Sequence, residues 1–187
     1  MIARRVRELN IYCEIFPYNK APKNIENFKG LILSGSPFSV HDVEAPSVNL
    51  EEFKNIPILG ICYGAQMVAK ISGCDVLKSE IREYGRAKLN YVNNSSLILD
   101  GVKSNSDVWM SHGDSIKNNK DVLEVIASTD DVEVASYYIK KLNFYGLQFH
   151  PEVTHSAEGK KILENFTVKI CGCNKKWTPD KFVEQTV

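Results

Sequence analysis

The chain has 187 residues and a formal net charge of +0, with 25% charged and 43% hydrophobic residues. This composition is typical of one soluble globular domain, and a chain of this size buries about 70% of its unfolded surface. Balanced charge argues against nucleic acid or an anionic membrane as a partner. No apolar run approaches the roughly 20 residues that span a bilayer, and the basic opening MIARRVRELN lacks the apolar core of a secretory signal.

Five cysteines are spread along the chain: Cys13, Cys62, Cys74, Cys171 and Cys173. Their number is odd and their spacing fits no disulfide framework, so we expect free thiols and a cytoplasmic protein. The C-x-C pair at 171–173 has no second pair or histidine cluster to complete a metal site. We therefore expect no bound metal, and an ordinary helix end closed by Gly172 accounts for this segment.

In the first half of the chain, helices alternate with strands: a helix is predicted over 2–10, strands over 11–18, 31–33 and 56–61, and a helix over 63–73. In the first helix Ile2, Val6 and Leu9 share one face. The strand at 56–61 is apolar throughout, as in parallel sheets covered on both faces.

The second half predicts mostly strands: short strands and turns over 75–92, 96–102 and 107–114, hairpin-like strands over 123–150, and a closing helix over 156–171. Ser156 is placed to cap that helix, with Ile162, Phe166 and Ile170 on its inward face. Strands interleaved with helices predict an α/β domain with a mostly parallel sheet flanked by helices.

Three stretches of the sequence end predicted strands with unusual residues: LSGSP, GICYG and QFHPE. In parallel sheets, binding sites gather at the carboxyl ends of the strands. We therefore expect these three stretches to form one site.

GICYG has the spacing of a nucleophile elbow, G-x-S-x-G, with sulfur in place of oxygen. Such a turn projects the nucleophile above the sheet, at the start of a helix whose dipole and free N–H groups favour a thiolate. The alternative for Cys62 is a buried structural cysteine, because cysteine is among the most buried residue types.

A nucleophilic cysteine needs a base and a group that orients the base. His150 follows a good core strand, and Glu152 is close enough to fix its tautomer. Taken alone, His150 is better explained as a surface histidine at a strand end, but with Cys62 at the same edge of the sheet the base is favoured. Backbone N–H groups of Ser36 and Tyr63 are candidate donors to a developing oxyanion, and a plain turn is the alternative for the SGSP segment.

In this order, LSGSP, GICYGAQ and QFHPE resemble the class I glutamine amidotransferases over nearly the whole chain. The resemblance implies that Cys62 attacks the side-chain amide of glutamine, with His150 as base and Glu152 as its partner. A glutamyl thioester and ammonia would form, and water would then release glutamate. This glutaminase step would need no cofactor.

The same resemblance implies a binding site for glutamine. Gln66 and the backbone around Gly35 and Ser36 would hold the substrate. The segment SHGD would complete the site with Ser111, His112, Gly113 and Asp114, and His112 would be a positioning residue.

REYGRA, WMSHGD, PEVTHS and the tail CGCNKKWTPDKFVEQTV resemble the branch of the family that is joined to an ATP-pyrophosphatase domain. Residues 1–174 would then form the amidotransferase domain, and residues 175–187 would begin the linker to the second domain. That absent domain, with ATP and Mg²⁺, would use the ammonia to convert xanthosine monophosphate to GMP. The REYG segment would face it, or would be a plain surface loop.

Two departures keep other readings open. Relatives begin with a strand ahead of the first helix, whereas this chain starts directly in that helix, and no phosphate loop like SGGVDS occurs. An inactive or truncated fragment is therefore one alternative. A glutaminase for anthranilate or carbamoyl phosphate synthesis is another, and a cysteine peptidase with the same elbow is a third.

Overall fold

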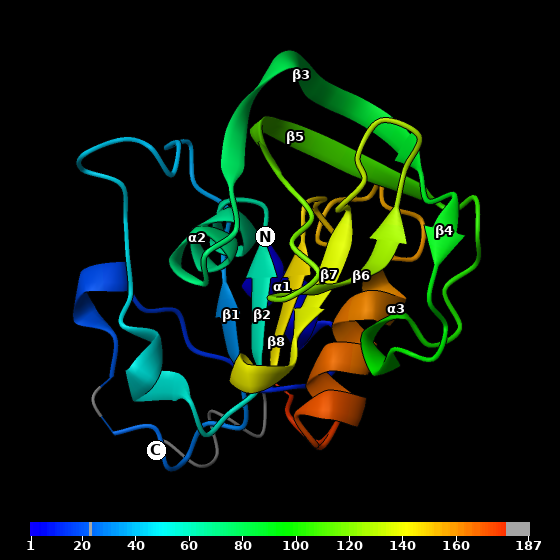
Figure 1. Ribbon diagram of the computed structural model, residues 1–187. Coiled ribbons are helices and arrows are strands. Elements are labelled where there is room, and N and C mark those ends of the chain that lie inside the picture. Colours follow the sequence, from blue (N-terminus) through cyan, green and yellow to red (C-terminus); the bar gives the residue numbers. More distant parts are fainter. Residues whose placement is uncertain (23, 179–187) are drawn as a thin grey trace.

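The computed structural model describes residues 1–22 and 24–178, and within them six strands form one sheet in the order β1-β2-β8-β7-β6-β4 (Figure 1). The strands of this sheet are β1 Leu31–Leu33, β2 Ile58–Ile61, β4 Tyr91–Val92, β6 Glu124–Ser128, β7 Ser136–Ile139 and β8 Phe144–Leu147. The helices are α1 Ile2–Arg7, α2 Tyr63–Ile71 and α3 Gly159–Glu164, which continues as a π-helical segment over Asn165–Ile170. Short 3₁₀ turns lie at Tyr18–Lys20, Leu50–Phe53, Leu97–Leu99 and Lys140–Leu142.

The expected α/β class is confirmed. β1, β2 and β8 are parallel neighbours, and the antiparallel β7 returns the chain so that β6 runs in their direction. Four of the six described sheet strands therefore point the same way. β2 is buried on both faces, as its unbroken apolar sequence predicts.

The two faces of the sheet carry separate apolar clusters. On one face α2 packs through Ala65 and Val68 against Ile58 and Phe144. On the other, α1 and α3 contribute Val6 and Ile162 to the second cluster. The helices thus cover both faces of the sheet but not the ends of its strands.

A two-stranded antiparallel ribbon crosses the upper end of the sheet in Figure 1. It consists of β3 Val76–Lys88 and β5 Asp107–Ile116, with a register shift between Lys78 and Glu83. An antiparallel bridge between Met110 and Phe149 joins β5 to the segment that follows β8. The ribbon therefore lies over the carboxyl end of β8.

The strand predicted over residues 11–18 is wrong. Ile11 is 3% exposed, but Ile15, on the same face of the predicted strand, is 73% exposed, so burial does not alternate along the segment. None of the described strands pairs with it, and its backbone stays outside the sheet. A strand needs a neighbour that takes up its hydrogen bonds, and side-chain alternation does not supply one.

Three further predictions differ from the structure. The region 75–92 is mostly the single long strand β3, because β5 supplies a partner along most of its length. The region 96–102 forms a 3₁₀ turn in which the adjacent Ile98 and Leu99 are both buried. The closing helix begins at Gly159 and not at residue 156, and Ser156 does not cap it.

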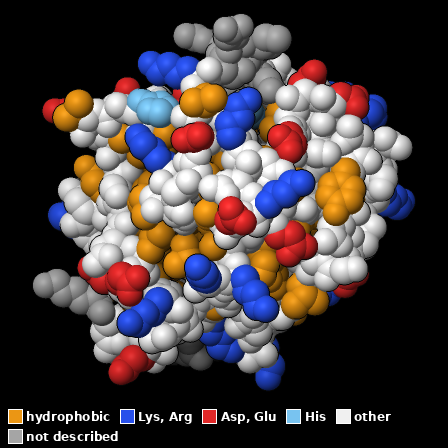
Figure 2. Space-filling model, in the orientation of Figure 1, with side chains coloured by type: hydrophobic (Ala, Val, Ile, Leu, Met, Phe, Trp, Pro, Cys, Tyr) orange, Lys and Arg blue, Asp and Glu red, His pale blue; other side chains and the backbone are white. Residues whose placement is uncertain are grey.

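On the face shown in Figure 2, acidic and basic side chains are mixed over the surface, in keeping with the balanced charge. Over the described part of the chain, every helix is too short or too polar to cross a membrane. The tail predicted to open a second domain lies partly outside the described residues, because the structure describes the chain only as far as residue 178. Within that range, the Trp177 N–H donates to the Asn10 carbonyl at 2.9 Å and ties the tail to the end of α1.

Candidate active site

Cys62 occupies the sharp turn between β2 and α2. Its backbone has φ 51° and ψ −106°, a conformation that costs a non-glycine residue about 1–3 kcal/mol. The Cys62 N–H donates to the Leu147 carbonyl at 2.7 Å, which fixes the turn to β8. A β-carbon at Gly64 would lie 2.5 Å from the Leu33 carbonyl oxygen, so the helix starts this close to β1 only with glycine there. The geometry is that of the predicted elbow.

His150 lies just beyond β8, beside the same turn. Its ring Nδ1 is 2.8 Å from Glu152 Oε1, and both side chains are largely buried. Nδ1 therefore carries a proton that it donates to the carboxylate. The other ring nitrogen, Nε2, is left to interact with the Cys62 sulfur. The sequence predicts that Glu152, two residues after His150, is close enough to contact its ring, and the structure shows this contact.

The charge state of His150 follows from these neighbours. Burial disfavours the imidazolium, but interactions with the Cys62 sulfur and the Glu152 carboxylate outweigh it and raise the pKa of His150 to about 10. His150 is therefore a cation at neutral pH. A histidine cation is the kind of neighbour that nucleophilic cysteines have in general.

The LSGSP stretch reaches the site at Gly35. A β-carbon on Gly35 would lie 3.2 Å from His150 Cε1 and 3.7 Å from Cys62 Cβ. The next residue, Ser36, is half-buried, and its hydroxyl accepts from the Phe38 N–H at 3.2 Å. Tyr63 follows the sulfur as the first residue of α2. The backbone at Gly35 and the first residue of α2 thus both lie next to Cys62.

The SHGD segment lies in β5, facing the turn. The Ser111 carbonyl oxygen is 3.6 Å from Cys62 Sγ, and His112 is buried beside His150. Burial is the main reason that the pKa of His112 is lowered, and the nearby His150 lowers it further. His112 is therefore neutral at neutral pH, unlike His150. Gly113 is half-buried.

Gln66 and Asp114 are buried together between α2 and β5. The Gln66 side-chain N–H donates to the Asp114 carbonyl at 2.8 Å, and the Asp114 carboxylate accepts from the Ser39 hydroxyl at 2.6 Å. The sequence predicts that Gln66 reaches a polar substrate, and in the structure its amide nitrogen holds β5. Together these bonds tie β5 and the loop after Gly35 to the helix that starts at Cys62.

Sequence reasoning missed three residues that support the site: Arg5, Trp109 and Ser156. The Arg5 guanidinium donates to the Glu152 carbonyl at 2.9 Å, and the His150 N–H donates to the Trp109 carbonyl at 3.0 Å. The Ser156 hydroxyl donates to the His150 carbonyl at 2.6 Å. The family likeness of the segment PEVTHS was the available signal for Ser156.

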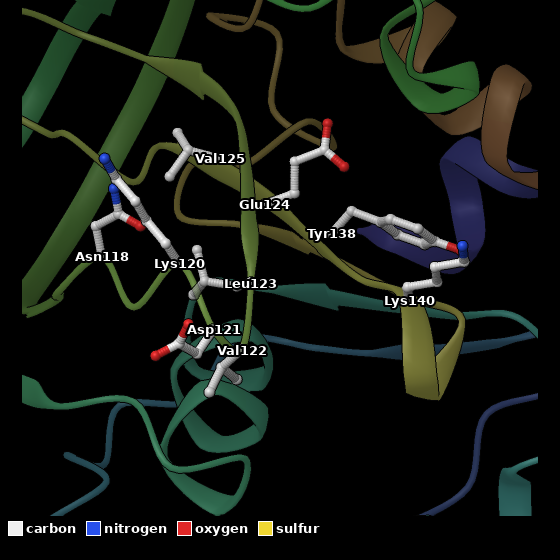
Figure 3. A pocket seen from close by; sticks show the side chains of 9 residues that line it. All are labelled: Asn118, Lys120, Asp121, Val122, Leu123, Glu124, Val125, Tyr138 and Lys140. Carbon is white, nitrogen blue, oxygen red and sulfur yellow. The ribbon is translucent and has the colours of Figure 1, made fainter.

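A groove of about 400 Å³ lies at the other end of the sheet (Figure 3). Tyr138 and Glu124 line it and pair with each other across β6 and β7, and Tyr138 in turn pairs with Tyr145 near the start of β8. The groove is thus separated from Cys62 by the length of the strands. It is lined by none of the predicted site residues.

Comparisons with known proteins find relatives of the whole chain. Residues 1–170 match the model of the family described as glutamine amidotransferase class-I. The chain is 54% identical over 188 residues to the glutamine-hydrolyzing GMP synthase of Cytophaga hutchinsonii, and 51% identical to GMP synthase 1 of Bacteroides thetaiotaomicron. Both alignments cover 100% of this chain but only 37% of the relative.

Solved structures show the same likeness. A structure assigned to one subunit of a GMP synthase from Thermoplasma acidophilum superposes with a TM-score of 0.80 at 31% identity, covering 98% of this chain and 89% of that one. A glutamine amidotransferase of Thermotoga maritima gives a TM-score of 0.70 at 24% identity, covering 99% and 83%. At that identity the second match supports the fold alone.

Proposed function

We propose, since this chain belongs to the glutamine amidotransferase class-I family, that it hydrolyses glutamine to glutamate and ammonia through Cys62, His150 and Glu152. One observation carries the proposal. Three segments far apart in the sequence bring a cysteine on a strained elbow, a cationic histidine and a glycine-lined backbone to one point above the sheet. A buried structural cysteine would need none of the three.

In the first step the Cys62 thiolate attacks the side-chain carboxamide carbon of glutamine. A carbon–sulfur bond forms and the carbonyl π electrons move to oxygen, where the backbone N–H groups of Ser36 and Tyr63 are placed to stabilise the charge. When the tetrahedral intermediate collapses, the carbon–nitrogen bond breaks. The His150 imidazolium gives its proton to the departing nitrogen, so that ammonia leaves and a neutral imidazole remains.

In the second step water hydrolyses the thioester. The neutral His150 takes a proton from water as the hydroxide oxygen bonds to the thioester carbon, and collapse of the intermediate breaks the carbon–sulfur bond. The products are the restored thiolate–imidazolium pair and glutamate, whose new carboxyl group releases its proton to solvent. Glu152 holds the ring in one tautomer throughout and stabilises its cationic form.

The substrate's polar groups have candidate partners around the sulfur. Gly35 and the SHGD segment, from Ser111 to Asp114, border the place where the attacked amide would sit. Gln66 and Asp114 shape the neighbouring wall through their mutual hydrogen bond. The glutaminase step itself uses only these residues and water, with no metal or cofactor.

The use of the ammonia is inferred from the relatives. The chain spans 37% of the length of the GMP synthases that it matches. In our proposal, residues 1–174 form the glutaminase domain and residues 175–187 begin the link to an ATP-pyrophosphatase domain or subunit. That partner would use ATP, Mg²⁺ and the ammonia to convert xanthosine monophosphate to GMP in the cytoplasm, with no nucleic-acid or membrane partner.

Ammonia release from glutamine, measured with and without a synthetase partner, tests the proposal. Cys62→Ala should abolish it. Cys74→Ala is the matched control, because Cys74 is equally buried but packs beneath α2, in the apolar cluster on the other side of the sheet from Cys62. If the partnered, folded wild-type protein released ammonia no faster than Cys62→Ala, the chain would be an inactive amidotransferase-like domain.

A further inference from the structure

The Ser156 side chain bridges two backbones at the site. Its Oγ donates to the His150 carbonyl at 2.6 Å and accepts from the Trp109 N–H at 3.1 Å. Ser156 is 6% exposed. Its hydroxyl therefore has both a donor and an acceptor role filled by the segments that it joins.

The register of the strands shows what this bridge replaces. Met110 and Phe149 form an antiparallel bridge, so Trp109 and His150 are the next pair along. In such a pair two residues normally exchange two direct N–H···O bonds. Here one is direct, from the His150 N–H to the Trp109 carbonyl at 3.0 Å. The Ser156 hydroxyl is inserted into the other.

We propose that Ser156 is a positioning residue for the triad: its hydroxyl fixes the backbone of His150 and thereby the place of the imidazole over Cys62. The proposal rests on the catalytic role proposed above for His150. The hydroxyl holds the His150 carbonyl away from β5 at the point where the chain leaves the sheet.

The bridge is held in place by its own surroundings. The Ser156 N–H donates to the Val153 carbonyl at 3.2 Å, which closes a turn over residues 153–156, directly after Glu152. The ring of His155 stacks on Trp109 with centroids 4.6 Å apart, on the residue whose N–H the hydroxyl accepts. The hydroxyl is therefore fixed from both sides.

Ser156 can act on the triad only through geometry, because it is uncharged. The titratable groups that face His150 are Cys62, Glu152 and His112, and Arg5 lies behind Glu152 at its carbonyl. Removal of the hydroxyl leaves all four in place. A change in how Cys62 ionises in a Ser156 variant therefore reports displacement of His150.

The experiment compares Ser156→Ala and Ser156→Thr with Ser136→Ala in the full 187-residue chain assembled with a synthetase partner. Ser136 is the matched control, because it is 0% exposed and its hydroxyl donates to the Gly146 carbonyl of β8 at 2.9 Å and not to a triad residue. Two readouts are used: glutaminase kcat and KM, and the pH dependence of Cys62 alkylation by iodoacetamide. The second readout does not require turnover.

We expect Ser156→Ala to lower kcat by about 10- to 100-fold with little change in the KM for glutamine, as small displacements of a catalytic group do. The alkylation profile should shift in Ser156→Ala, return in Ser156→Thr and stay unchanged in Ser136→Ala. If wild type lacked glutaminase activity but the alkylation shift appeared, the positioning role would stand and the proposed function would fail.

A Ser156→Ala variant with lowered melting temperature but wild-type kcat and alkylation profile would overturn the proposal, because the hydroxyl would then be purely structural. Failure of Ser156→Thr to restore the profile would also overturn it. Should Ser156→Ala not fold, Ser156→Cys, whose thiol is a weaker donor, replaces it, with alkylation of Cys62 followed by peptide mapping. An unchanged Cys62 profile in that variant would again overturn the role.

Discussion

Gly35 faces His150 across the site at close range: a β-carbon on Gly35 would lie only 3.2 Å from His150 Cε1. That separation is shorter than ordinary van der Waals contact, and the imidazole is already fixed by Glu152 at 2.8 Å. The loop after β1 therefore limits where the ring can lie. The glycine at position 35 is therefore explained by the neighbouring imidazole and not by the backbone conformation of the loop.

Gly35→Ala should lower glutaminase kcat by about tenfold or more, because the added methyl displaces the ring from the sulfur. The melting temperature should change little, since the loop is half-exposed. Gly30→Ala serves as the control, because its β-carbon would press on Cys171, far from the triad. That variant should lose stability but keep its kcat per folded molecule. Equal kcat in Gly35→Ala and Gly30→Ala would show that the space beside His150 does not affect catalysis.

The protonation of His150 can be followed directly by NMR of its ring protons. Its pKa is raised to about 10 against an ordinary value of about 6.5, despite burial, by Cys62 and Glu152. The imidazolium signal should therefore persist to about pH 10 in wild type. Cys62→Ala and Glu152→Gln should each move the transition to lower pH.

The same shift predicts a dependence of stability on pH. The folded state holds the His150 proton more tightly than the unfolded state, so this contribution is complete below pH of about 6.5 and is lost as the pH rises through about 10. Urea unfolding at several pH values should show that loss in wild type and a smaller one in His150→Gln. A neutral His150 at pH 7.5 would contradict both results and the acid role in ammonia release.

Arg5 and Arg4 make a matched pair for testing how α1 supports the triad. Both donate to the exposed Glu8, but Arg5 also donates to the Glu152 carbonyl at 2.9 Å. Arg5→Ala should lower the free energy of unfolding by about 1–2 kcal/mol, since a hydrogen bond from a charged donor to a partly buried carbonyl is lost. It should also lower kcat, whereas Arg4→Ala should change both quantities little. Similar effects of the two substitutions would mean that Arg5 acts only through its ion pair with Glu8 and not through the Glu152 carbonyl.

Sequence patterns located the site better than they located the elements around it. The glycines flanking Cys62 and the pair His150 and Glu152 are local signals, because the elbow and the tautomer contact need only a few consecutive residues. The structure places them as the spacing predicts. Their chemical roles stay a prediction until activity is measured.

What the sequence could not show depends on distant partners. Residues 11–18 alternate like a strand, but whether a strand forms depends on a neighbour elsewhere in the chain. Ser156 reads as a helix cap, because serine before an amphipathic stretch usually is one. Its hydroxyl instead joins Trp109 and His150, and a contact across 47 residues leaves no periodicity in the sequence.

The five cysteines provide a final test, since the thiolate is the form that reacts with alkylating agents. Burial raises the pKa of Cys171 to about 12 and also raises the pKa of Cys13, Cys74 and Cys173. Cys62 alone among them faces the cationic His150. At pH 7.5, brief treatment with iodoacetamide should therefore modify Cys62 first, as measured by peptide mass mapping.

Glutamine should slow the modification of Cys62 by iodoacetamide, because it occupies the site, whereas a glutamine-like alkylating agent should modify Cys62 faster than iodoacetamide does. His150→Ala should slow the reaction at Cys62 by about tenfold or more, because the neighbouring cation that favours the thiolate is gone. The other four thiols should react as before and so act as internal controls. Modification of Cys13 or Cys173 ahead of Cys62 would mean that exposure, and not the imidazolium, governs thiol reactivity in this chain.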